Sequence, residues 1–463
     1  MSIEATLESK FTGELIGPDD PGYEEARKLF NGAIDKRPAL IARCAGSSDV
    51  QAALGWARQN DLVVAVRGGG HSTAGHSSCD DGIVIDTGPM KHAEIDVEAR
   101  TGRFGAGMNW GELDAATQEH GLAVTGGRVT HTGVAGLTLG SGSGWIDRKC
   151  GVTCESLISA EVVTADGSVV RASADENPEL LWGLKGGGGN FGVVTEFEFK
   201  LHPVGPIVYA GMIMHPRAAA PELARFYRYF MEKAPEEVGG GLALLTAPPE
   251  EFVPEEGRGQ PATGLILVYV GDPEKGEEIL RPLVEWGDPW VKMVQPMPYV
   301  AVQQMIDGGN PWGIREYFKV AYLRELSDDA IDTAVEKAAG IASPFTQVIL
   351  APLGGAVSRT DRSAMALDIP DAPWLYFYLA MWWEEGDTDQ EVGWARSFME
   401  TMRPWAVDHA PQPNFISQDE GEARLRTSYG DEKFERLVAL KDKYDPDNVF
   451  SLNQNIPPSM PAA

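Results

Sequence analysis

The first stretch that could perform chemistry is Arg67-Gly68-Gly69-Gly70-His71-Ser72, with Gly75 and His76 close behind. Three consecutive glycines can take positive φ angles and bring the backbone close to a ligand, because no Cβ stands in the way. Free N–H groups in such a loop suit a phosphate or a pyrophosphate. The imidazole of His71 would then stand where it could bond to the bound group. A glycine-rich turn with a surface histidine explains the same residues, so this motif alone leaves both interpretations open.

A second glycine-rich region begins at Gly126-Gly127 and continues over residues 133–144. It ends in alternating Gly-Ser-Gly-Ser-Gly, which is too poor in helix and strand formers to predict a regular element. A flexible linker would not be flanked by Val134, Leu137 and Trp145. We therefore expect a tight loop that is pressed against a flat ligand.

A third glycine region has the G-x-G-x-x-G spacing at Gly187, Gly189 and Gly192. In nicotinamide-dinucleotide proteins this motif follows a strand and opens a helix. Here residues 193–201 alternate apolar and polar side chains with a period of two, which predicts a strand instead. The context therefore argues against a nicotinamide cofactor.

Hydrophobic periodicity predicts helices and strands along the whole chain. The expected helices are residues 47–60, 110–120, 219–233, 272–286, 327–339 and 431–443. The expected strands include residues 62–66, 82–86, 103–107, 157–164, 168–172, 193–201, 242–247, 263–271, 346–350 and 374–382. Glycine density falls beyond residue 203, so we place a domain boundary near residue 205. Mixed strands and helices beyond it predict an antiparallel sheet covered by helices, and hence an α+β protein.

The predicted strand at residues 374–382 carries Tyr376, Tyr378 and Trp382 on one face. Core packing explains most such aromatic residues. Large aromatic side chains with hydroxyl groups also suit the wall of a pocket, and the neighbouring segment 313–323 adds further polar side chains. These are Arg315, Tyr317, Lys319 and Tyr322.

Near the end of the chain, Asn453 and Asn455 are two residues apart. In an extended segment they would point the same way and could form paired hydrogen bonds to a polar heterocycle. A polar surface tail is the alternative interpretation.

Composition excludes several classes of function. The chain has 463 residues, 23% of them charged, and a net charge of −29, which argues against binding to nucleic acid or to an anionic membrane surface. Residues 1–11 do not resemble a secretory signal peptide, and no apolar run reaches the ~18 residues of a membrane span. The four cysteines suit free thiols in a reducing compartment, so we expect a cytoplasmic protein. His71, His76 and Cys79 match no zinc spacing, so we expect no metal site.

Taken together, these motifs resemble the berberine bridge enzyme-like FAD-linked oxidases, within the vanillyl-alcohol-oxidase/PCMH-type flavoproteins. The resemblance covers nearly the whole chain and includes the stretches 67–72, 133–140, 148–151, 185–195, 441–450 and 453–456. It implies a PCMH-type FAD-binding domain at residues 1–205 and a substrate-binding domain at residues 206–440. A C-terminal segment, residues 441–463, would return to the first domain.

The resemblance implies that His71 is joined covalently to the 8α-methyl group of FAD. Many members of the family carry a second link from a cysteine, and the matching position here is Val129, or lies within about one residue of it. No cysteine occurs between Cys79 and Cys150, so the resemblance implies one covalent bond. The residues expected to contact FAD are Arg67, Gly68, Gly69, Gly70, His71, Ser72, Gly75, His76, Gly126, Gly127, Val129, Thr132, Gly133, Gly136, Leu139, Gly140, Gly142, Ser143, Gly144, Gly192, Val194, Asn453 and Asn455.

The resemblance also implies hydride transfer from a small alcohol, sugar or secondary metabolite to the flavin, with dioxygen as electron acceptor. Many members use the tyrosine of an Asn-Tyr pair as the base, but the matching pair here is Asn414-Phe415. The remaining candidates for the base are Tyr378, Tyr376, Tyr317, Tyr322 and Glu384. We favour Tyr378, because its strand resembles the flavin-facing sheet of the family. A neighbouring Lys319 or Arg315 could lower a tyrosine pKa.

Two alternatives stay open. The protein could be a dehydrogenase that passes electrons to an acceptor other than oxygen. It could also be a flavin-binding protein whose active site has decayed, and Phe415 is the feature that favours this second alternative.

Overall fold

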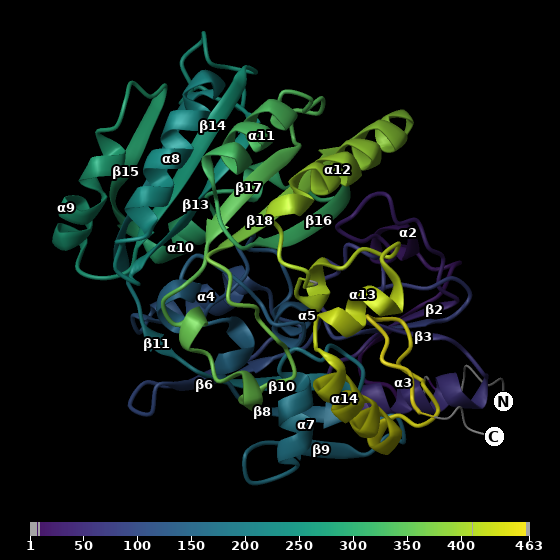
Figure 1. Ribbon diagram of the computed structural model, residues 1–463. Helices are drawn as coiled ribbons and strands as arrows, with labels where there is room; N and C mark the ends of the chain where they lie inside the picture. The colour runs from purple at the N-terminus through teal and green to yellow at the C-terminus, as the bar shows by residue number, and fades with distance from the viewer. Residues whose placement is uncertain (1–6, 8–9, 410, 460–463) are drawn as a thin grey trace.

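The computed structural model describes residues 7, 10–409 and 411–459. Its N-terminal part contains a four-stranded sheet, a five-stranded sheet and a two-stranded sheet that joins β7 (Leu122–Ala123) to β11 (His202–Pro203) (Figure 1). In the first sheet the strand order is β1 (Glu14–Ile16), β2 (Leu40–Arg43), β4 (Ile83–Asp86) and β3 (Val64–Arg67). The last three strands are parallel, and α3 (Ser47–Gln59) packs its apolar face against them. The triple glycine directly follows β3.

The second sheet is antiparallel, in the order β5 (Ala93–Asp96), β6 (Thr101–Gly105), β10 (Val193–Lys200), β8 (Leu157–Val163) and β9 (Val169–Ala172). Strand β10 confirms the period-two pattern that follows the G-x-G-x-x-G spacing. α4 (Trp110–Gln118) begins with a capping box between Asn109 and Glu112. The shorter elements of this part are α2 (Tyr23–Ala26), β7 (Leu122–Ala123), α6 (Asp147–Cys150), α7 (Pro178–Leu184) and β11 (His202–Pro203).

The rest of the chain forms a seven-stranded antiparallel sheet. Its order is β15 (Val291–Pro298), β12 (Ile207–Pro216), β14 (Pro261–Tyr269), β13 (Val238–Thr246), β17 (Gln347–Pro352), β18 (Trp374–Trp382) and β16 (Arg315–Leu323). One face carries α8 (Ala220–Met231), α9 (Pro273–Val284), α11 (Asp328–Ala338) and α12 (Thr388–Met402) (Figure 1). The α+β prediction of an antiparallel sheet covered by helices is confirmed.

Strand β18 lies between β17 and β16 at one end of this sheet, and all of its residues are buried. The sheet therefore has a core on both faces. One face packs against the helices, and the other turns toward the N-terminal part of the chain. Because side chains alternate along a strand, each position of β16, β17 and β18 belongs to one face or the other.

The C-terminal segment returns to the N-terminal part. In α14 (Asp431–Tyr444), the fully buried Lys441 pairs with Asp445 at 2.7 Å. Its ammonium group also donates to the carbonyl oxygens of Asn190 and Phe450, at 3.1 and 3.0 Å. Since Asn190 lies in the third glycine region, these bonds fix residues 445–455 beside that region. The exact domain boundaries stay a prediction.

The structure contains several elements beyond those expected, including the ten-residue strand β12. α5 (Val134–Leu139) is a short helix within the region that we expected to be irregular, since those six residues contain only one glycine. Strand β15 went unpredicted because it is an edge strand with two prolines and a largely exposed pattern. Helix α12 also went unpredicted, as did the short elements α10 (Tyr299–Gln303) and α13 (Gly421–Thr427). Within the described ranges, no helix is long and apolar enough to cross a membrane.

Candidate active site

A cavity of about 370 Å³ lies between the glycine loops and the sheet of β16, β17 and β18. Its volume is typical of ligand and cofactor sites. The loop after β3, the segments 127–143 and 188–194, and the C-terminal residues 450–454 all contribute to its wall. Motifs that the sequence analysis identified separately therefore meet at one site.

Two glycines of this wall, one from each of the first two glycine regions, are in backbone contact with each other. A Cβ on Gly69 would stand 2.3 Å from the backbone nitrogen of Gly133, and a Cβ on Gly133 would stand 2.3 Å from that of Gly69. Neither position can accept a side chain without a shift of the backbone. The two glycine regions consequently form one continuous surface of exposed peptide groups, which suits a ligand that lies against the backbone.

Most of the residues expected to contact FAD line the cavity. They are Gly68, Gly69, Gly70, His71, Ser72, His76, Gly127, Val129, Thr132, Gly133, Gly136, Leu139, Gly140, Gly142, Ser143, Gly192, Val194 and Asn453. Five others lie outside the lining: Arg67, Gly75, Gly126, Gly144 and Asn455. Of these, Arg67 forms a buried ion pair with Asp86 at 2.8 Å, which indicates a structural role. Sequence reasoning did not identify Phe30, Asn310 and Gln454, which also line the cavity.

His71 stacks on Phe30, with the two ring centroids 4.2 Å apart. Its Nε2 lies 2.7 Å from Nδ1 of His131. Burial, and then the neighbouring His131, lower the pKa of His71 to about 3. The imidazole is therefore neutral near pH 7 and keeps a lone pair.

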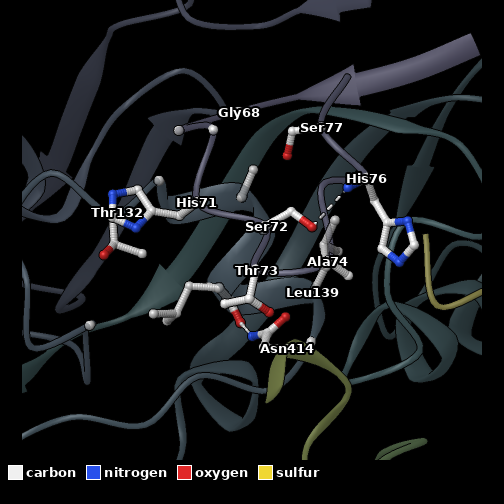
Figure 2. A pocket seen from close by; sticks show the side chains of 18 of the residues that line it. Gly68, His71, Ser72, Thr73, Ala74, His76, Ser77, Thr132, Leu139 and Asn414 are labelled. Atoms are coloured by element: carbon white, nitrogen blue, oxygen red, sulfur yellow. Dashed lines mark hydrogen bonds between the residues drawn. The ribbon is translucent and has the colours of Figure 1, made fainter. Parts of the chain in front are cut away.

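The other end of the same loop turns around Ser72, whose hydroxyl accepts a hydrogen bond from the backbone nitrogen of His76 at 3.1 Å (Figure 2). Figure 2 also shows Asn414 entering the site from the C-terminal part of the chain. Its side chain donates to the carbonyl oxygen of Leu137 at 3.0 Å. Burial lowers the pKa of His76 to about 4, so this second histidine is also neutral. No three His, Cys, Asp or Glu side chains of the described residues gather as a metal site would require.

The wall opposite the glycine loops is the inner face of β16, β17 and β18. It is mainly apolar, and its side chains are Phe318, Ile349, Phe377, Leu379, Glu316 and Gln347. Phe415 packs edge-on against Phe377 at 5.2 Å and extends this apolar surface. A ligand between the two walls would meet few hydrogen-bonding side chains on the sheet side.

Glu316 is the carboxylic acid of this cavity. The residue is 4% exposed, and neither carboxyl oxygen has a hydrogen-bond partner among the residues that the structure describes. Burial raises the pKa of Glu316 to about 8. A strongly shifted pKa in a cleft is a frequent property of catalytic acids and bases. Sequence reasoning missed Glu316, although it is the one acid within β16 and shares a face of the strand with the apolar Phe318 and Val320.

The structure does not place the favoured tyrosines at the cavity. Tyr378 and Tyr376 lie on the opposite face of β18, in the core beneath the helices. There the rings of Tyr378 and Phe398 pack together, with their centroids 4.9 Å apart. Tyr317 donates to Asp419 at 2.8 Å on the same helix side. Tyr322 is on the inner face but packs in a core cluster outside the cavity lining.

The remaining candidate, Glu384, is exposed beyond the end of β18. The structure gives no support to Tyr378 as the base, because its side chain lies on the face of β18 that points away from the cavity. Both faces of this strand are apolar and buried, so alternation could not show which face meets the ligand.

The residues present fit FAD. Backbone surfaces at Gly69 and Gly133 admit a close approach, and His71 is a neutral imidazole in the lining. Asn453 offers a buried side-chain oxygen with no hydrogen-bond partner within the described part of the chain. Buried polar atoms normally have partners, so this oxygen indicates a polar ligand. A flat heterocycle attached to a pyrophosphate meets all of these requirements.

Comparison with known proteins agrees with this geometry. Residues 38–173 match the family model described as an FAD binding domain, and residues 413–457 match the one described as berberine and berberine like. The FAD-linked oxidoreductase YgaK of Bacillus subtilis strain 168 is 30% identical over 459 residues, which cover 97% of this chain and 98% of YgaK. The chain belongs to the berberine bridge enzyme-like FAD-linked oxidoreductases.

This berberine bridge enzyme-like protein is also similar to one further curated relative and to one solved structure. The (R)-6-hydroxynicotine oxidase of Paenarthrobacter nicotinovorans is 29% identical over 469 residues, which cover 99% of each chain. The structure of BBE-like 1 from Physcomitrella patens superimposes with a TM-score of 0.88 over 100% of both chains, at 21% identity, and shows the shared fold.

Val129, the position matched to the second covalent link of many relatives, does line the cavity of this berberine bridge enzyme-like protein. The described cysteines Cys44, Cys79, Cys150 and Cys154 are buried free thiols, and none of them lines the cavity. A single attachment of FAD at His71 stays a prediction.

Proposed function

We propose that this berberine bridge enzyme-like protein is an FAD-linked oxidase. It would take a hydride from a small, largely apolar organic molecule and use dioxygen as electron acceptor. The observation that carries the proposal is the unpaired, buried carboxyl group of Glu316, which shares one cavity with His71 and the glycine loops.

FAD would be held by the loops around Gly69 and Gly133, by Asn453, and by one covalent bond to His71. When bound, FAD supplies a two-electron acceptor for the hydride. The protein contributes position and exclusion of water. Phe377 and Leu379 cover the site with apolar surface, which strengthens electrostatic interactions inside it.

Glu316 would take the proton that the substrate loses during oxidation. The carboxyl group of Glu316 can act as a general base only in its ionised form, and burial raises its pKa to about 8. Oxidation of the substrate should therefore become faster as the pH rises through about 8. This role replaces the one that we first assigned to Tyr378.

The lining also supports a choice among substrate classes. A sugar ring needs many hydrogen-bonding partners, whereas the sheet side of the cavity offers mainly Glu316 and Gln347. An apolar secondary metabolite with one ionisable O–H or N–H group beside the oxidised carbon fits better. The same unpaired carboxyl group argues against a decayed active site, despite Phe415.

A substrate screen tests the proposal. The purified holoenzyme is mixed without oxygen with apolar alcohols, apolar amines and sugars, and the visible absorbance of the oxidised flavin is followed. We expect bleaching by members of the apolar classes and hydrogen peroxide after air is admitted. Bleaching by sugars alone would contradict the substrate class, and bleaching by no compound of any class would contradict the enzymatic function.

Dioxygen as the acceptor is tested separately. The reduced enzyme is mixed with air, and the return of flavin absorbance is compared with turnover. Reoxidation at least as fast as turnover is expected of an oxidase. Reoxidation far slower than turnover would instead favour the dehydrogenase alternative.

A further inference from the structure

His71 and His131 form a hydrogen-bonded chain at one end of the cavity. His71 Nε2 lies 2.7 Å from His131 Nδ1, and His131 Nε2 lies 3.1 Å from the carbonyl oxygen of Asn310. Burial lowers the pKa of His131 as well as that of His71. Near pH 7 each ring is therefore neutral and carries one N–H group.

The carbonyl group of Asn310 determines where both protons lie. A carbonyl oxygen can only accept, so the proton of His131 is on Nε2 and its Nδ1 is a lone pair. That lone pair can accept only from an N–H group on His71 Nε2. Consequently Nδ1 of His71 carries the free lone pair, and no described residue donates a hydrogen bond to it.

We infer that His131 is a positioning residue for the covalent attachment of FAD. It keeps the nucleophilic lone pair of His71 on Nδ1 and receives the Nε2 proton when the new bond forms. The inference rests on the proposed function, because it requires His71 to be the attachment point.

The bonds and electrons of this step balance. His71 Nδ1 forms a bond to the 8α-methyl carbon, one C–H bond of that methyl group breaks, and its electron pair reduces the ring system. Loss of the Nε2 proton toward His131 removes the positive charge that alkylation creates on His71. Dioxygen then accepts the two electrons, and the two protons of the resulting hydrogen peroxide balance those lost from the methyl group and from His71.

The loop that carries His131 is held from the other part of the chain. The neighbouring Thr130 donates its backbone N–H group to Asp307 at 2.9 Å. Asn310 is itself fixed, because its side chain donates to the carbonyl oxygen of Ile306 at 2.8 Å. Segment 306–310 thus sets the position of His131, and through it the proton on His71.

The test compares full-length variants for their rate of covalent attachment. Protein that retains unlinked sites is incubated with FAD in air, and the covalent adduct is followed by intact mass and by the colour of acid-denatured protein. We expect His131→Ala to slow attachment on the order of 100-fold, the scale of a lost general base. His131→Asn keeps an oxygen that can accept from His71 Nε2 but cannot take its proton, so its attachment should be slower than that of the wild type and faster than that of His131→Ala.

Chemical rescue separates this role from packing. Added imidazole should accelerate attachment in His131→Ala and leave the wild type unchanged. Non-covalent FAD binding and thermal melting are measured on the same samples. Attachment in His131→Ala at the wild-type rate would overturn the inference while leaving the covalent bond intact, and so would slow attachment that imidazole does not accelerate. A wild type with bound FAD but no adduct would instead overturn the covalent bond itself, without touching the oxidase proposal.

Discussion

The substitution Glu316→Gln removes the ionisable group of the cavity and keeps its shape. If Glu316 is the base, the rate of flavin reduction by substrate should fall by about 10²- to 10⁴-fold. That range corresponds to about 3–5 kcal/mol of barrier height, at 1.36 kcal/mol for each tenfold change. The pH dependence should change too, because the rise in rate through about pH 8 belongs to this carboxyl group.

The same group should reduce the stability of the folded protein at high pH. Its pKa is raised by burial from 4.5 to about 8. Below pH 4.5 both the folded and unfolded states hold the proton, so the group has no effect. Between these two values only the unfolded state releases the proton, and the free energy of unfolding falls as the pH rises. At about 1.4 kcal/mol per pH unit, the loss reaches up to about 5 kcal/mol at pH 8.

Glu316→Gln should therefore be slower but more stable than the wild type at pH 8, and similar to it in stability at pH 4.5. Anaerobic stopped-flow measurements from pH 6 to 10 give the reduction rate, and urea denaturation at both pH values gives the free energy of unfolding. Reduction at the wild-type rate with the same pH profile would refute the assignment of the base. A stability difference that is independent of pH would refute the assignment of the raised pKa.

Three other substitutions test the site and its scaffold. Tyr378→Phe should leave the reduction rate unchanged and raise stability by up to about 1 kcal/mol, because the buried hydroxyl has no partner among the described residues; a large loss of rate in stopped flow would return Tyr378 to the active site. Lys441→Met should cost about 3–5 kcal/mol in urea denaturation, since it leaves Asp445 buried without its cation; a cost below about 1 kcal/mol would show that the pair is not needed. Gly133→Ala should lower the fraction of protein that takes up FAD at least tenfold, measured as the ratio of flavin to protein absorbance, whereas Gly55→Ala, with no atom within 4 Å of the added Cβ, should take up FAD normally; equal uptake would contradict the backbone-contact argument.

Much of the cofactor side could be predicted from the sequence because its signals are local. Three consecutive glycines before His71 and the glycine pair at 126–127 allow positive φ angles and a close approach of the backbone to a ligand wherever they occur. The strand after Gly192 was equally readable, since its alternating pattern is continuous over eight residues. Such signals need no knowledge of how distant segments meet.

The substrate side could not be read in this way. The aromatic residues of β18 are prominent, but both faces of the strand are buried, so their pattern does not reveal which face meets the cavity. Glu316 becomes significant only through its burial and its lack of partners, both of which are tertiary properties. His131 acquires its role from His71, 60 positions away, and from Asn310, 179 positions away.

The pairing of Lys441 with Asp445 has a consequence for biosynthesis. Asn453 and Gln454 line the cavity, and they reach it only after the seven-stranded sheet has been made. A nascent chain that has emerged only as far as α5 and β10 therefore lacks part of the wall around the cofactor. The complete cofactor wall therefore forms only after residues 441–454 have left the ribosome and folded back against the third glycine region.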